Sequence, residues 1–216
     1  MPRAGLNTSE VVASGAELAD EAGFASVSLA ALAERLGVKA PALYKHVDGI
    51  GDLQHRIATL AMTELGDALR DALQGKSGAD AIGALFTALR SYIVEHPGRY
   101  NSTTGSQFQG GGDPLLAAAT RVIDSVRAVL SGYDIQPDEL DHAVRTLRCM
   151  IHGYALLQAA NAFQWGNDPD ESVVWMIRFV DAGLTAVAGM DRQSTKSDSA
   201  FGMNPTRRDP IDRDRH

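Results

Sequence analysis

The sequence predicts an all-α fold, with an N-terminal three-helix domain followed by a C-terminal helical bundle that dimerises. Three observations support this prediction. Apolar residues recur at spacings of three and four along most of the chain, no strand-like alternation is sustained, and clusters of Gly, Pro, Asn, Asp and Ser separate the periodic segments. We place the N-terminal domain at residues 1–51, the C-terminal domain at 52–190 and a flexible, mixed-charge tail at 191–216, where the periodicity is lost.

The first two helices are predicted from the residues at their ends. The first begins at Asn7 or the residue after it, because Glu10 can complete a capping box with Asn7, and it ends at Gly23. The second begins after its N-cap Ser28 and ends at Gly37, since glycine adopts the left-handed conformation without strain.

The stretch "GVKAPALYKHV", residues 37–47, predicts a third and very short helix, with Pro41 in its first turn and its end near His46. Two short helices joined by a turn have the length of a helix-turn-helix, whose second helix enters the DNA major groove. A small core is expected to fix their crossing, formed by Leu29, Leu32, Leu36, Val38, Leu43 and Val47. From spacing alone, an ordinary surface helix of a bundle remains an alternative.

Side chains on the outside of this unit are candidates for contact with DNA. Tyr44 and His46 can donate to phosphate oxygens, and Lys39 and Lys45 add charge-assisted contacts that position the unit without reading sequence. Small residues at the start of the helix allow close approach, and alanine methyls can contact a thymine methyl. The predicted DNA-binding residues are Ser28, Lys39, Ala40, Pro41, Ala42, Tyr44, Lys45 and His46.

The rest of the chain predicts a helical bundle. A long helix capped by Asp52 is expected to end near Leu73, and Pro97-Gly98 is expected to close the next helix before a loop over residues 102–112. The expected helices are 52–73, 80–96, 113–130, 137–162 and 172–188. The last two carry wide apolar faces, which we expect to face a second subunit.

Composition excludes several classes of protein. The chain has 216 residues with 44% hydrophobic residues, which is enough to bury a sizeable core. Its net charge of -7 argues against nonspecific coating of nucleic acid, so contact with DNA must be local. A single cysteine excludes an intrachain disulfide framework, and no apolar run of membrane-spanning length is evident, so we expect a soluble, cytoplasmic protein without membrane contact.

The N-terminal region resembles the DNA-binding domain of the TetR family. The match rests on the capped second helix at Ser28, the Gly37-Val38 turn and the recognition helix "ALYKHV", and it covers residues 7 to about 60. It continues more weakly through "EHPGRY" at 95–100 and "MIHGYALLQAANAFQW" at 150–165. The latter resembles a regulatory domain named for a Trp-His-Gly motif, with Ile151-His152-Gly153 at its place.

The C-terminal domain contains aromatic and polar-tipped residues among aliphatic ones. Core packing explains most of them, but a minority that points into one cavity would form a ligand pocket. The predicted ligand-binding residues are Tyr92, Tyr100, Phe108, His152, Tyr154, Gln158, Phe163, Trp165 and Trp175.

The resemblance implies a homodimeric, ligand-responsive transcriptional regulator, specifically a repressor that a small-molecule effector releases from double-stranded operator DNA. It implies neither an enzyme nor a cofactor. Two alternatives remain open: a constitutive DNA-binding regulator without an effector, and an all-helical enzyme that uses His152. Cys149 and His152 form a C-x-x-H pair, but two ligands are too few for a zinc site.

Overall fold

A computed structural model describes residues 6–164, 166 and 168–201, with 190–201 described by their backbone alone. Within this part every regular element is helical, which confirms the all-α prediction. The elements are α1 (Thr8–Ala22), η1 (Phe24–Ser26), α2 (Leu29–Leu36), η2 (Ala40–Lys45), α3 (Ile50–Leu73), α4 (Gly78–Glu95), α5 (Pro97–Gly105), α6 (Pro114–Leu130), η3 (Ser131–Tyr133), α7 (Leu140–Ala159) and α8 (Pro169–Phe201).

The N-terminal helix ends form as predicted. The Asn7 carboxamide oxygen accepts from the Glu10 N–H at 2.9 Å, and the Glu10 carboxylate accepts from the Asn7 N–H at 3.0 Å, so the capping box is complete. The Ser28 hydroxyl accepts from the Ala31 N–H at 3.2 Å. Gly37 has φ 66° and ψ 31°, the left-handed conformation expected of it. The third helix is a 3₁₀ helix, η2, rather than an α-helix.

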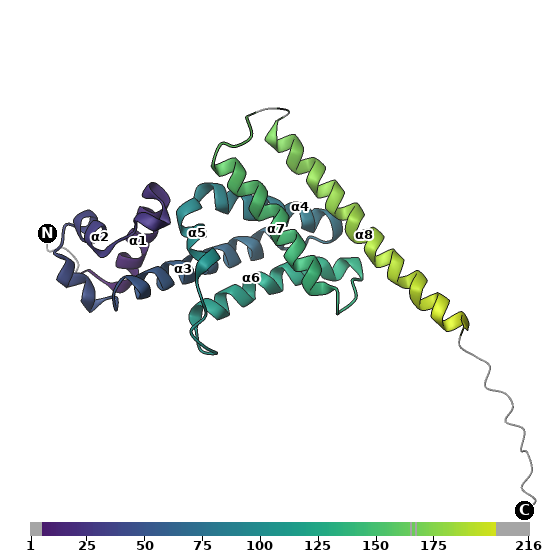
Figure 1. Ribbon diagram of the computed structural model, residues 1–216, viewed down its shortest axis with the longest axis horizontal. Coiled ribbons are helices and arrows are strands. Elements are labelled where there is room, and N and C mark those ends of the chain that lie inside the picture. Colours follow the sequence, from purple (N-terminus) through teal and green to yellow (C-terminus); the bar gives the residue numbers. More distant parts are fainter. Residues whose placement is uncertain (1–5, 165, 167, 202–216) are drawn as a thin grey trace, which may run out of the picture.

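α3 connects two hydrophobic cores. Its first half contributes Leu53 and Ile57 to the core beneath α1, α2 and η2, and its second half contributes Leu65 and Leu69 to the core of the bundle. All four side chains are buried. Figure 1 shows this helix running from the N-terminal unit into the bundle. A displacement of α3 in one domain therefore reaches the other through a continuous helix.

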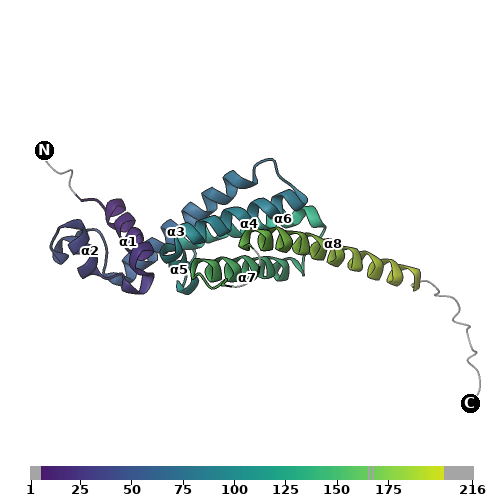
Figure 2. The same cartoon turned by 90° about the horizontal axis from the view of Figure 1, so that it is seen from above.

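The bundle is formed by α3 to α8. α3 packs on α4 and α6, and α4 packs on α7 and α8, while α5 lies between the bundle and α1. Figure 2 shows the N-terminal helices at one end of the molecule, with α8 extending past the bundle at the other.

Several expected helix ends differ in the structure. Gly49, rather than Asp52, is the N-cap of α3, and Asp52 lies in the first turn, where its carboxylate accepts from the Asp48 N–H at 2.9 Å. Pro97 is the first residue of a further helix, α5, a position where proline is favoured. Because α5 continues to Gly105, the expected loop over 102–112 begins only after that residue. Hydroxyl side chains of α5 donate to backbone carbonyls three residues earlier, so its polar sequence is compatible with a helix.

The last helix also differs from its expected range. α8 continues to Phe201, whereas the sequence predicted its end near Ala188 and a flexible tail from residue 191. Residues 191–201 contain no proline or glycine that would stop a helix. The rest of the expected tail, 202–216, lies outside the described residues.

One stretch of α8, Pro169–Gly189, is long and apolar enough to cross a membrane by length and composition alone, although charged residues interrupt it.

Candidate functional site

Seven of the eight predicted DNA-binding residues lie in η2 or cap its ends, and the eighth, Ser28, is the N-cap of α2, which packs on η2. Leu43 and Val47 are buried beneath it, and this burial directs Tyr44 outward, with 60% of its surface exposed. Ser28, Lys39, Pro41 and Lys45 are also exposed, whereas Ala40, Ala42 and His46 are half-buried. The structure thus places the seven residues from Lys39 to His46 together at η2, with Ser28 on the adjoining helix α2. Their contact with DNA stays a prediction.

The two lysines at η2, Lys39 and Lys45, are free to contact phosphate. Among the described residues, no carboxylate lies within ion-pair distance of Lys39 or Lys45. Two acidic residues of α1 instead pair with Arg35, whose guanidinium contacts Glu21 at 2.6 Å and Glu17 at 2.9 Å. These contacts lower the pKa of Glu21 through its hydrogen bond with Arg35. An acidic chain can therefore present a locally positive surface.

Substitution of Lys45 with alanine is expected to weaken DNA binding similarly for all sequences and to reduce the slope of log K against log salt by about 1 per subunit, because a phosphate contact is lost. Substitutions at Ala42 should instead change the preferred sequence. Lys76→Ala is the matched control, since Lys76 is exposed between α3 and α4, away from η2. Binding isotherms at several salt concentrations measure both effects. An unchanged slope for Lys45→Ala would contradict its phosphate role.

The bundle contains a cavity of ≈ 350 Å³ between α3, α4, α5, α6 and α7. Of the predicted ligand-binding residues, Tyr100 and Phe108 line it, and His152 lies behind Tyr100, with its Nδ1 3.1 Å from the phenol oxygen. The complete lining is Met62, Leu65, Leu69, Leu85, Leu89, Tyr100, Thr103, Thr104, Ser106, Phe108, Leu115, Ala119, Val122, Ile123, Val126, Val144, Leu147, Arg148 and Ile151.

Other predicted ligand-binding residues lie elsewhere. The Tyr92 hydroxyl donates to the Glu64 carboxylate at 2.9 Å, and Gln158 accepts from Arg90 at 2.6 Å. Tyr154 donates to the Pro169 carbonyl, and its ring lies 4.8 Å from that of Phe163. Trp175 is 59% exposed on α8 and stacks on Phe179. Trp165 lies outside the described residues.

Sequence reasoning missed Arg148 and the hydroxyl residues of α5 that line the cavity. Arg148 lies four residues before His152 on α7, so the two side chains share a helix face. This spacing is the signal that could have identified it. Burial, together with the positive charge of Arg148, lowers the pKa of His152, whereas burial raises the pKa of Tyr100 against the opposing effect of Arg148.

α5 joins this cavity to the N-terminal domain. Arg99 bridges α1 and α3, since its Nε donates to Asp20 at 2.8 Å and its guanidinium also donates to Glu64 at 3.0 Å. The Arg99 backbone N–H donates to Asp20 as well, at 2.8 Å. One residue earlier, Gly98 is packed against the backbone of Ala19 at the end of α1. One residue later, Tyr100 lines the cavity. A single turn of helix therefore contacts both regions.

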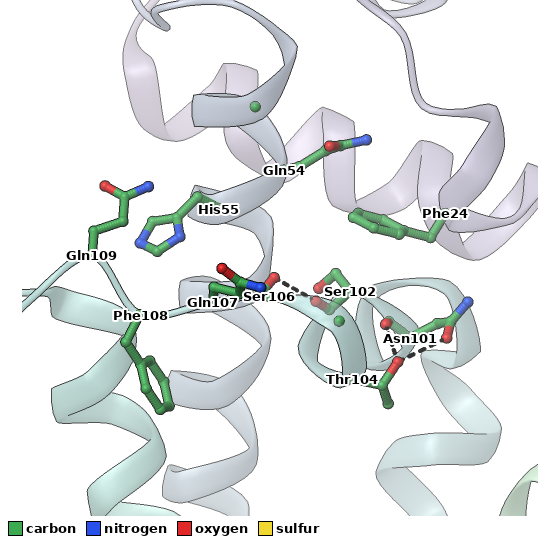
Figure 3. A pocket seen from close by; sticks show the side chains of 12 residues that line it. Phe24, Gln54, His55, Asn101, Ser102, Thr104, Ser106, Gln107, Phe108 and Gln109 are labelled. Carbon is green, nitrogen blue, oxygen red and sulfur yellow. Dashed lines mark hydrogen bonds between the residues drawn. The ribbon is translucent and has the colours of Figure 1, made fainter.

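A second connection runs through the loop before α6. His55 of α3 lies 2.8 Å from the Asp113 carboxylate, and this carboxylate also accepts the backbone N–H groups of Gln109 and Leu115. Hydrogen bonds from these groups lower the pKa of Asp113 against the effect of its burial. Figure 3 shows the neighbouring cleft, in which His55 and Gln54 of α3 face Phe24, α5 and the loop with Phe108 and Gln109.

A helix-turn-helix on an all-helical bundle is the architecture of a DNA-binding protein, and comparison with known proteins identifies its family. Residues 11–53 match the family of bacterial regulatory proteins named for tetR, and residues 82–180 match the tetracyclin repressor-like C-terminal domain. The chain belongs to the TetR family. The predictions of this family and of a ligand-responsive, DNA-binding repressor are confirmed at this level. The Trp-His-Gly subtype stays a prediction.

Relatives support the same assignment. The uncharacterized HTH-type transcriptional regulator Rv0681 of Mycobacterium tuberculosis is 33% identical over 196 residues, which cover 90% of this chain and 86% of the relative. The uncharacterized HTH-type transcriptional regulator YobS of Bacillus subtilis is 30% identical over 187 residues, which cover 85% of this chain and 95% of the relative. A solved structure of a protein of unknown function from Rhodococcus sp. RHA1 has the same fold, with a TM-score of 0.71 and 22% identity. The match covers 86% of this chain and 99% of that protein.

Proposed function

We propose that two copies of this chain bind a palindromic operator through their η2 surfaces, and that a small molecule in the α3–α7 cavity releases them. The observation that carries this proposal is the position of α5. Tyr100, Thr103 and Thr104 of this helix line the cavity, while Gly98 and Arg99 contact α1 in the N-terminal domain. A ligand that moves α5 must also move the domain that carries η2.

Dimerisation is proposed through α7 and α8. Leu157, Val174, Trp175 and Phe179 are all exposed in the single chain, although these are large apolar side chains. Trp175 stacks on Phe179, and large apolar side chains exposed in this way are typical of an interface with another chain. The same face accounts for the apolar composition of Pro169–Gly189 without a membrane. A two-fold dimer places its recognition helices at whole-turn spacings, about 34 Å or a multiple, along the DNA.

A coupling of about 1–3 kcal/mol between effector and DNA would be ordinary for such a protein. Both connections contribute to the proposed route, because Arg99 ties α5 to α1 and α3, and Asp113 ties the loop before α6 to His55 of α3. The constitutive alternative requires a filled C-terminal domain, and the ≈ 350 Å³ cavity argues against it.

Purified full-length protein is expected to sediment as a dimer and to recover a palindromic site from random-sequence DNA. Trp175→Glu should yield monomers and lose that site, because a charge in the apolar interface is costly. Trp175→Phe retains the apolar face and is the matched control. A dimer that persists in Trp175→Glu would place the interface elsewhere, and a wild-type protein that selects no site would contradict operator binding.

A further inference from the structure

The cavity in the bundle is polar on one side alone. Its polar side chains come from α5, the residue after it and α7, whereas α3, α4 and α6 contribute apolar side chains throughout. The apolar lining from these three helices is Met62, Leu65, Leu69, Leu85, Leu89, Leu115, Ala119, Val122, Ile123 and Val126. A molecule that fills this space must therefore have an apolar body and a polar end that faces α5 and α7.

Arg148 is the one charged residue in this lining, and no acidic residue lines the cavity beside it. Its side chain is exposed as well as lining the cavity, which places it at the mouth. Among the described residues, no carboxylate lies within ion-pair distance of its guanidinium. Its positive charge also acts on the neighbouring His152, whose pKa burial and this charge both lower. The lining thus carries one unpaired positive charge.

The remaining hydroxyl donors at this end are already in use. Thr103 donates to the Tyr100 carbonyl at 2.7 Å, and Thr104 donates to the Asn101 carbonyl at 2.8 Å. Ser106 donates to a backbone carbonyl of α5 at 2.7 Å. Strong N–H donors for a ligand therefore come from Arg148, whose planar guanidinium matches a carboxylate with two parallel hydrogen bonds.

The size of the cavity limits the ligand. At about 30 Å³ for each small group, the volume that a water molecule occupies in the liquid, ≈ 350 Å³ holds about a dozen non-hydrogen atoms. A carboxylate takes three of these atoms, which leaves an apolar body of roughly nine carbons.

We propose that the effector is a monocarboxylate with an apolar body of this size, held by Arg148 at the mouth of the cavity. The proposal rests on the function proposed above and names the chemistry of its effector. The carboxylate neutralises Arg148 beside Tyr100, and the apolar body lies against α3, α4 and α6. Because Tyr100 belongs to α5, the ligand contacts the helix that joins the cavity to α1.

Decanoate, decan-1-ol and decylammonium provide a matched series of probes with the same chain and different charge. Calorimetric titration of the full-length dimer is expected to show decanoate binding at least about tenfold tighter than decan-1-ol, and decylammonium binding weakest. Arg148→Gln should remove the preference for decanoate, because it weakens decanoate binding far more than decan-1-ol binding. Arg145→Gln is the control, since Arg145 is an exposed arginine of α7 that does not line the cavity.

The outcomes separate this inference from the proposed function. Equal binding of decanoate and decan-1-ol to the wild-type protein, or an Arg148→Gln variant that keeps the preference for decanoate, would overturn the carboxylate proposal. If a neutral or cationic probe releases the selected DNA site and decanoate does not, the proposed function holds and the inference fails. If decanoate binds through Arg148 without releasing DNA, the ligand chemistry holds and the proposed regulation fails.

Discussion

Gly98→Ala is expected to lower the free energy of unfolding by about 3 kcal/mol or more, because α5 can no longer pack closely on α1. A Cβ atom at Gly98 would lie 1.8 Å from the Ala19 carbonyl oxygen, 2.1 Å from its carbon and 2.6 Å from the Asp20 nitrogen. These are backbone atoms, so no side-chain rotation can relieve the overlap. α5 must move away from α1, and this movement also breaks the contacts of Arg99 with Asp20.

Gly105→Ala is the matched control for this substitution. Gly105 is the last residue of the same helix, and a Cβ atom there would meet nothing within 4 Å. Alanine also favours the helix more than glycine does, so the free energy of unfolding of Gly105→Ala should be unchanged or slightly raised. Urea unfolding followed by circular dichroism measures both variants. Equal stability of the two would show that α1 and α5 are not packed in this way.

The N-terminal domain could be predicted in detail because its signals are local. The capping box at Asn7, the N-cap at Ser28 and the left-handed Gly37 each depend on residues within one turn, and all three form. Asp52 was wrong as an N-cap because an aspartate in the first turn of a helix has the same sequence signal as one at its start. The sequence does not distinguish these two positions.

α5 and the cavity could not be predicted because they depend on contacts between distant segments. The sequence "PGRYNSTTG" is polar and has a loop-like composition, yet α1 packs on it and Asp20 accepts the Arg99 N–H. For a similar reason, the sequence does not show which aromatic residues line the cavity and which are exposed. Composition alone does not determine whether Tyr100 lines a cavity while Trp175 faces outward, because the packing of α5 and α8 on the other helices sets their orientation.

Arg99→Gln is expected to lower the free energy of unfolding by about 2–3 kcal/mol, because it leaves two carboxylates facing each other at the junction of α1, α3 and α5. The Arg99 side chain is 12% exposed and Asp20 is 15% exposed, so solvent screens their interaction weakly. Glu64 is more exposed, which keeps the expected loss below that of a fully buried pair. Asp20 retains the Arg99 backbone N–H, and Glu64 retains the Tyr92 hydroxyl.

Arg70→Gln is the control, because Arg70 also contacts two carboxylates, those of Asp67 and Asp71, but its side chain is 56% exposed. Exposed pairs contribute about 0–1 kcal/mol, so its loss should be small. The two tryptophans, at positions 165 and 175, both belong to the C-terminal domain, whereas circular dichroism reports on both domains. If Arg99 ties the domains together, thermal unfolding of Arg99→Gln should show an early circular-dichroism transition without a change in tryptophan emission. Coincident transitions with wild-type stability would mean that α3 and the packing of Gly98 hold the domains together without this arginine.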